Sequence, residues 1–402
     1  MINRIFTVLL LPIACSPVKG TPLIDAPDLT LESLSVTPGS ASIERAFGSA
    51  EQLSVMATLA DGATMDVTPL VTWASSDPTI ASVDRVGSVS ATGAGTATIT
   101  ATYREVAGSA QVTTFDPTLV VNSASPIGVN FYDAFANGDV APLRTISGSN
   151  AFAVATELWG ISVAGNELFV TALITNTIYV FPADGSGDIA PLRTISGSNT
   201  GLDSPYGLFV SNGEIYVVNG DPTVANDSIA VFPAEGSGNI APTRVIAGTA
   251  TLLSQPVGIS VADNEIYIAN QIGGLVEVFP AEGSGNIAPT RTIGGAQTLL
   301  TNAVDIRVMN GELYVANWIN STLLVFPQNG SGDILPLRAL SGSDTALLRP
   351  FSLGLVGEQI VVANNGAQVC SLDAQGQGDQ STVSQITGSN TELVSPTSLF
   401  AY

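Results

Sequence analysis

The chain contains no histidine and only two cysteines among its 402 residues. The absence of histidine removes Ser-His-Asp and Cys-His nucleophile systems, histidine general bases and histidine-ligated zinc. Cys15 and Cys370 are too few and too far apart for a CxxC metal site. No catalytic residue is therefore assigned from the sequence, and the question of enzymatic activity stays open, with the weight toward a non-enzyme.

Positive charge is also scarce, with 12 Lys and Arg against 34 Asp and Glu, a net charge of −22 and a pI of about 4.1. This balance repels phosphate backbones, so we predict no nucleic-acid partner. Charged residues make up only 11% of the chain and hydrophobic residues 45%, which indicates packed cores rather than charge-rich disorder. Long helical apolar stripes are missing. The abundance of Gly, Ser, Thr, Ala and Val favours an all-β protein.

The first 15 residues, MINRIFTVLLLPIAC, combine one arginine with an apolar run that is too short to span a membrane. This pattern is typical of a secretory signal. Its end resembles a bacterial lipobox, which implies lipidation of Cys15. We therefore expect an exported protein, either an outer-membrane or cell-surface lipoprotein or a secreted protein, with membrane contact only through a lipid anchor. Residues 16–30 are Pro-rich and unpatterned, as in a tether.

Residues 31–115 show short alternating strands separated by turn signals, which predicts a β-sandwich. Threonines alternate with Ala and Ile over 96–102, as one wet and one buried face require. The segments VTWASSDPTIASVD (71–84) and GSVSATGAGTATITA (87–101) resemble the group 2 bacterial Ig-like domain. The resemblance implies a cell-surface spacer or adhesion module. Trp73 is expected to be a core tryptophan.

From residue 116 onward, one segment recurs, with VFPADGSGDIAPLRTISGS (180–198) as its clearest copy. The arginine of each copy marks the period: Arg144, Arg193, Arg244, Arg291 and Arg338. Steps of 47 to 51 residues are typical of a propeller or solenoid. Each unit contains four strand patterns, and its inner strands are apolar throughout because both faces are covered. The proline before each arginine suits an outer strand, and the arginine is expected to pair with a nearby carboxylate there.

Five complete units run from 157 to 388, and the fragments 118–148 and 395–402 supply the strands of one more. The prediction is therefore an Ig-like β-sandwich followed by a six-bladed β-propeller closed by the C-terminal strand. The units resemble NHL-type and lactonase-type repeats. The predicted organisation is a signal (1–15), a tether (16–30), an Ig-like domain (31–115) and the propeller (116–402).

The first and second strands of a unit run antiparallel, so the start of the first and the end of the second lie at one mouth. Five of the six second strands end in asparagine: Asn122, Asn219, Asn270, Asn317 and Asn364. The first strands begin with Gly or Ser except at Asp305. Asn219, Asn270 and Asp305 could hold Ca²⁺, which takes oxygen ligands. Alternatively, each asparagine caps its own turn.

Glu157, Trp159, Tyr206 and Trp318 flank the same mouth and, with Asp305, form the candidate ligand-binding set. Aromatic faces beside polar groups suit sugars or other flat amphipathic ligands. The alternative is that the aromatic rings fill space between units. The turn DGSGD (184–188) looks like the opening of a calcium loop but lacks its continuation, and a tight turn explains it.

Three functions follow as hypotheses. The favoured one is an exported, surface-tethered binding or adhesion-type protein whose partner is a glycan, a peptide or an extracellular protein. The second is a Ca²⁺-dependent hydrolase, in which the resemblance to lactonases implies Glu157, Asn219, Asn270 and Asp305 around the cation. The third is a structural envelope protein.

Overall fold

The computed structural model describes residues 30–45, 50–155, 157–220 and 226–402. The predicted signal with Cys15, and all but the last residue of the predicted tether, lie outside the described residues. Regular structure in the described ranges is β-strand apart from two short 3-10 helices at Thr68–Leu70 and Ser389–Thr391, so the all-β class is confirmed. No helix in those ranges is long and apolar enough to cross a membrane.

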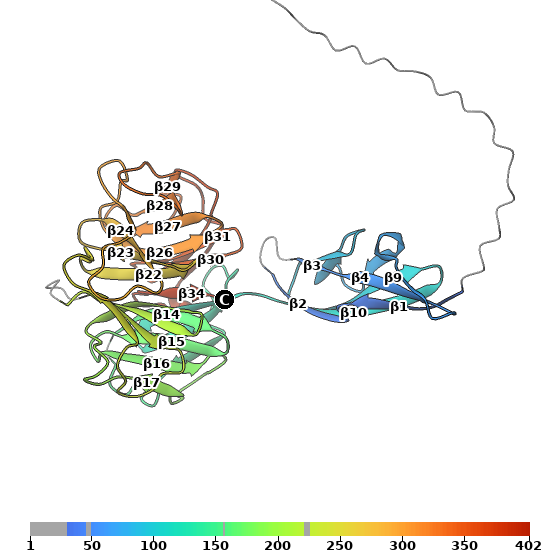
Figure 1. The fold of residues 1–402 in the computed structure, drawn as a ribbon, viewed down its shortest axis with the longest axis horizontal. Coiled ribbons are helices and arrows are strands. Elements are labelled where there is room, and N and C mark those ends of the chain that lie inside the picture. The colour runs from blue at the N-terminus through green and yellow to red at the C-terminus, as the bar shows by residue number, and fades with distance from the viewer. Residues whose placement is uncertain (1–29, 46–49, 156, 221–225) are drawn as a thin grey trace, which may run out of the picture.

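The N-terminal part forms three small sheets around its own core (Figure 1). The first sheet contains β1 (Leu31–Thr37), β4 (Ser54–Leu59) and β5 (Thr64–Asp66). The second contains β2 (Ser40–Glu44), β10 (Val106–Phe115), β9 (Gly95–Tyr103) and β6 (Thr72–Ser75). The third contains β3 (Ala50–Gln52), β8 (Ser88–Ala91) and β7 (Ala81–Val83). Strand β9 buries Ala97, Ile99 and Ala101, and Trp73 packs against the same core, as the sequence pattern predicts.

The repeat region forms six four-stranded antiparallel sheets. Five of them follow the chain in order. They are β14 (Leu158–Ala164), β15 (Glu167–Ala172), β16 (Thr177–Pro182) and β17 (Arg193–Ile195); β18 (Pro205–Ser211), β19 (Glu214–Asn219), β20 (Ser228–Pro233) and β21 (Arg244–Ala247); β22 (Pro256–Ala262), β23 (Glu265–Asn270), β24 (Leu275–Pro280) and β25 (Arg291–Ile293); β26 (Ala303–Met309), β27 (Glu312–Asn317), β28 (Thr322–Pro327) and β29 (Arg338–Leu340); β30 (Pro350–Val356), β31 (Gln359–Asn364), β32 (Gln368–Asp373) and β33 (Ser384–Thr387). The sixth joins both ends of the region: β34 (Leu399–Ala401), β11 (Thr118–Ala124), β12 (Ile127–Asp133) and β13 (Arg144–Ser147).

The prediction of a six-bladed β-propeller closed by the C-terminal strand is corrected by this topology. The sheets of the described residues are small, mostly four-stranded and separate, and none of them closes on itself, which fits a propeller poorly. The C-terminal strand β34 pairs with β11, with Val121 opposite Leu399. That pairing completes one four-stranded sheet and closes none. The physical reason is that the repeat period fixes the strands of each unit, whereas strand pairing ends at the outer strand of each sheet. Beyond that strand, only isolated parallel bridges, such as the one between Ile146 and Gly187, reach a neighbouring unit.

The first strands of consecutive sheets pack against one another at close range. Glycine makes this approach possible: a Cβ on Gly207 would lie 2.4 Å from the carbonyl oxygen of Val257, on the next first strand. A Cβ on Gly258 would lie 2.5 Å from Cα of Asp305 in the same way. Small residues at the start of the first strands are therefore required by strand packing.

Two contacts formed by the repeated segment join neighbouring sheets. Arg244 donates from Nη1 and Nη2 to the two carboxylate oxygens of Glu214, at 2.6 and 2.8 Å, and from Nη2 to the carbonyl of Ala281 in the next sheet, at 3.1 Å. The carboxylate belongs to the second strand, not to the outer strand as expected. Hydrogen bonding to Arg244 lowers the pKa of Glu214. The Oδ1 of Asp188 accepts from the backbone N–H groups of Asn150 and Ala151, at 2.7 and 3.1 Å.

Candidate functional site

The two strand ends predicted to share a mouth do lie together. Asn219 at the end of β19 is opposite Pro205 at the start of β18, and Asn317 is opposite Ala303 in the same way. The loops that enter and leave these strands also bond to each other, since the N–H of Trp318 donates to the carbonyl of Asn302 at 3.0 Å. We call this end of the repeat region the mouth.

The asparagines at the mouth bind the turns of their own sheets. The Oδ1 of Asn219 accepts from the N–H of Asp203 at 3.1 Å, and its Nδ2 donates to the carbonyl of Gly201 at 3.1 Å and to Ser228 Oγ at 2.9 Å. The Oδ1 of Asn270 accepts from the N–H of Ser254 at 3.0 Å. This geometry corresponds to the second interpretation of the asparagines, in which each side chain caps a turn of its own sheet.

Asp305 is buried below the mouth with both carboxylate oxygens engaged. Oδ1 accepts from the N–H of Ile306 at 2.8 Å and from Arg307 Nη1 at 2.9 Å. Oδ2 accepts from Ser352 Oγ and from the N–H of Leu353, each at 2.8 Å. A guanidinium beside this carboxylate repels a second cation, and the amide oxygens of Asn219 and Asn270 are already occupied. These three residues therefore do not fit a Ca²⁺ site. The described residues contain no group of three or more Asp, Glu, Cys or His placed to hold a metal.

The aromatic residues predicted for the ligand site gather into one cluster. The ring of Trp159 packs edge-on against Tyr206, with centroids 4.6 Å apart, and against Phe351 at 6.0 Å. Phe351 also contacts Trp318 at 5.8 Å, so it links the two tryptophans. Trp159 Nε1 donates to Glu157 Oε1 at 2.8 Å. The structure thus brings together Glu157, Trp159, Tyr206 and Trp318, and adds Phe351, which the sequence reasoning missed.

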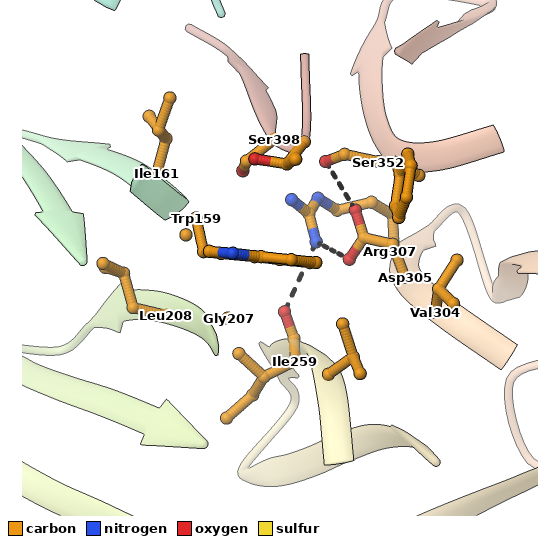
Figure 2. Close-up of a pocket in the computed structure, with 14 residues that line it drawn as sticks. Trp159, Ile161, Gly207, Leu208, Ile259, Val304, Asp305, Arg307, Ser352 and Ser398 are labelled. Carbon is orange, nitrogen blue, oxygen red and sulfur yellow. Dashed lines mark hydrogen bonds and ion pairs between the residues drawn. The ribbon is translucent and has the colours of Figure 1, made fainter. Parts of the chain in front are cut away.

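A narrow pocket opens beside this cluster (Figure 2). It encloses about 320 Å³, part of it open solvent, and its inner space has room for about one water molecule. The wall combines Trp159 and Phe351 with the polar side chains of Asp305, Arg307 and Ser398. Asp305 and Arg307 lie on β26, and Ser398 directly precedes β34. The pocket therefore joins an aromatic rim to a polar floor.

Arg307 is the functional candidate that sequence reasoning missed. It is 8% exposed, and Figure 2 shows its guanidinium pointing into the pocket from β26 toward Ser398. The first strands of the other sheets carry Ser, Phe or Gly at the matching position: Ser162, Phe209, Ser260, Gly354 and Phe400. A cation at this one position was therefore visible in the sequence once the copies were compared, two residues after Asp305.

A second missed group is Glu277 on β24, which is completely buried. β24 is the third strand of its sheet. At the matching position, the third strands of four other sheets carry apolar or aromatic residues: Tyr179, Ala230, Leu324 and Cys370. Neither carboxylate oxygen of Glu277, nor the Nδ2 of Asn270, has a hydrogen-bond partner in the described part of the chain. Burial raises the pKa of Glu277, the neighbouring amide of Asn270 lowers it, and the charge of Asp227 raises it, with a net pKa of about 8.

Comparison with known proteins adds two kinds of likeness. Residues 31–114 match the family model of the bacterial Ig-like domain (group 2), which confirms the resemblance drawn from residues 71–101. Ice-binding protein 1 of Shewanella frigidimarina (strain NCIMB 400) is 30% identical over 129 residues, which cover 32% of this chain and 14% of that protein. The chain therefore spans about a seventh of the length of this curated relative.

One solved structure gives the fold likeness. A chain in the crystal structure of a nidogen/laminin complex, a β-propeller-like neighbour, has a TM-score of 0.52 at 13% identity, covering 71% of this chain and 97% of its own. At that identity the likeness extends to the fold alone. Together with the Ig-like domain, the relative indicates a surface or binding-type protein.

Proposed function

We propose that the protein is an exported binding or adhesion-type protein, held at the bacterial cell surface or secreted, whose ligand binds at the mouth. In this proposal, residues 1–15 are the signal, 16–30 the tether, 31–115 the Ig-like spacer and 116–402 the ligand-binding unit. The observation that carries it is the cluster of Trp159, Tyr206, Phe351 and Trp318 beside a pocket with a polar floor.

A glycan is the ligand class that this arrangement favours over a peptide or an extracellular protein. Indole rings offer apolar faces to the C–H surfaces of a sugar, while polar groups at the rim reach its hydroxyls. Trp159 has its indole N–H fixed by Glu157, and Trp318 lies under the guanidinium of Arg349 at 5.0 Å, so both rings are held in place. Rings that are already ordered lose little conformational entropy on binding.

The relative from Shewanella frigidimarina supports a surface role but not a ligand. Its printed name assigns ice binding to that protein, of which this chain matches only 14% of the length. The structural neighbour shares the fold at 13% identity, and no partner is carried over from it. The ligand class therefore rests on the mouth itself.

The test is a glycan array probed with residues 16–402, followed by titration of the sugars that bind. Trp159→Phe and Trp318→Ala should each weaken binding by roughly two- to tenfold, because aromatic contacts of this kind contribute about 0.5–1.5 kcal/mol. Trp73→Phe in the Ig-like part makes the same kind of change far from the mouth and serves as the matched control.

Binding that survives both mouth variants would place the ligand elsewhere and contradict the proposal. A folded protein that binds no glycan, but captures a peptide or an extracellular protein through these tryptophans, would keep the mouth and change the ligand class. A folded protein that binds nothing in any of these assays would leave the structural envelope interpretation.

A further inference from the structure

Arg307 has unused hydrogen-bonding capacity inside the pocket. Its Nη1 donates three times, to Asp305 Oδ1 at 2.9 Å and to the carbonyls of Ile306 and Ile259 at 2.8 and 3.3 Å. Its Nε and Nη2 have no partner among the described residues, although the side chain is only 10% exposed. Neither atom is among the fully buried side-chain atoms that lack a partner, so both remain accessible from the pocket.

The two neighbouring serine hydroxyl groups differ in whether they already have hydrogen-bond partners. Ser352 Oγ donates to Asp305 Oδ2 at 2.8 Å and accepts from the N–H of Leu399 at 3.1 Å, so it is fully engaged. Ser398 is 7% exposed and lines the pocket, and its Oγ has no partner within the described ranges. Figure 2 shows Ser398 on the side toward which the guanidinium of Arg307 points. Three donors therefore remain open: Nε and Nη2 of Arg307 and the hydroxyl of Ser398.

We propose that this pocket binds the carboxylate of an acidic sugar, a hexuronate, with Arg307 and Ser398 as its ligands. The Nε–H and Nη2–H of a guanidinium are parallel and match the two oxygens of a carboxylate. The inner space has room for about one water molecule, which is enough for one carboxylate oxygen. The second oxygen and the sugar ring then lie in the wider part of the pocket, toward the aromatic rim near Trp159. The inference rests on the proposed function and names the ligand class of the same site.

Two features limit the affinity of the site. Asp305 already neutralises the charge of Arg307, and the net charge of −22 opposes the approach of an anion. A single sugar also offers few contacts. We therefore expect a dissociation constant on the order of 1 mM for a monosaccharide, with selectivity for the acid as the diagnostic property.

The experiment compares D-glucuronate with D-glucose, which differ in this carboxylate, by saturation-transfer difference NMR on residues 16–402. We expect a saturable signal for glucuronate and a signal at least about tenfold weaker for glucose, as charged hydrogen bonds of this kind imply. Arg307→Lys keeps the charge but removes the parallel donors, so glucuronate binding should fall about tenfold. Arg85→Lys changes an exposed arginine of the Ig-like part, outside the pocket lining, and should leave it unchanged.

Ser398→Ala keeps the Asp305–Arg307 pair intact and guards against a folding defect in the lysine variant. It should weaken glucuronate binding about threefold or more without lowering the melting temperature. Equal signals for glucuronate and glucose would overturn the carboxylate site while leaving a sugar-binding mouth in place. No signal for glucuronate, or binding unaffected by both Arg307→Lys and Ser398→Ala, would also overturn it.

Discussion

Replacing Glu277 by glutamine should abolish a pH dependence of stability that is built into the core. Glu277 is completely buried, and neither of its oxygens has a hydrogen-bond partner among the described residues. Burial raises its pKa from 4.5 to about 8 in the folded chain. Between these values the folded protein keeps a proton that the unfolded chain releases. The free energy of unfolding therefore falls as the pH rises from about 4.5 to about 8, and levels off above that.

The size of the effect follows from the two pKa values. Each tenfold change in an ionisation constant corresponds to about 1.4 kcal/mol, so the interval from 4.5 to about 8 gives at most about 5 kcal/mol. Partial hydration on ionisation reduces this, and we expect a loss of roughly 2–4 kcal/mol. Glutamine keeps the side-chain length and carries no charge. Glu277→Gln should therefore match the wild type near pH 5 and exceed it by a few kcal/mol near pH 8.5.

Urea unfolding at pH 5, 7 and 8.5, followed by tryptophan fluorescence, measures both curves. Glu235→Gln provides the control, because Glu235 is the exposed carboxylate of a repeated turn and its removal leaves the core unchanged. Parallel pH profiles for the wild type and Glu277→Gln would refute the reasoning, since they would show that Glu277 titrates alike in the folded and unfolded chains.

The remaining predictions concern the contacts that hold the sheets together. Gly207→Ala should cost about 2–3 kcal/mol in urea unfolding, because the new Cβ would lie 2.4 Å from a carbonyl oxygen of the next first strand. Asp188→Ala should cost about 1 kcal/mol through its lost backbone hydrogen bonds, whereas Asp184→Ala, at an exposed position of the same turn, should be neutral within about 0.5 kcal/mol. Arg244 lowers the pKa of Glu214, so this pair should stabilise the fold above about pH 4.5. As the pH falls through the pKa of folded Glu214, the free energy of unfolding should decrease by about 1 kcal/mol. Arg244→Gln should reduce this decrease at acid pH. EDTA should leave the melting temperature unchanged, and a shift of several degrees would reveal a bound metal.

The strand pattern of the repeat region was predictable because its signals are local. Alternating Ile, Val and Phe with Gly-Ser-Gly turns fix each four-stranded sheet, and complementary end fragments identify the pairing of β34 with β11. The arginine period located the outer strands correctly. The closed propeller was wrong, because closure by strand pairing needs continuous ladders between units, and only isolated bridges extend beyond the outer strands. The repeats carry no direct signal for pairing between units.

The site was only partly predictable for a different reason. Topology alone places Trp159, Tyr206 and Trp318 at one mouth, and the structure brings them together. Side-chain partners depend on rotamers and on neighbouring sheets. The sequence therefore did not show that Phe351 contacts both tryptophans or that Arg307 forms an ion pair with Asp305. Both Arg307 and Glu277 nevertheless stand out as charged residues at positions that are uncharged in every other copy.

The pairing of β34 with β11 has a consequence for the order in which the chain is made. Asn122 holds the backbone N–H groups of Thr397 and Ser398 with its Oδ1, across 276 sequence positions in the second case. Until residues 397–401 emerge, the edge of β11 has no strand beside it, and such an edge is prone to pairing with other chains. The pocket also lacks Ser398 during that interval. An incomplete chain therefore has both an unpaired strand edge and an incomplete pocket, and the same short C-terminal segment completes both.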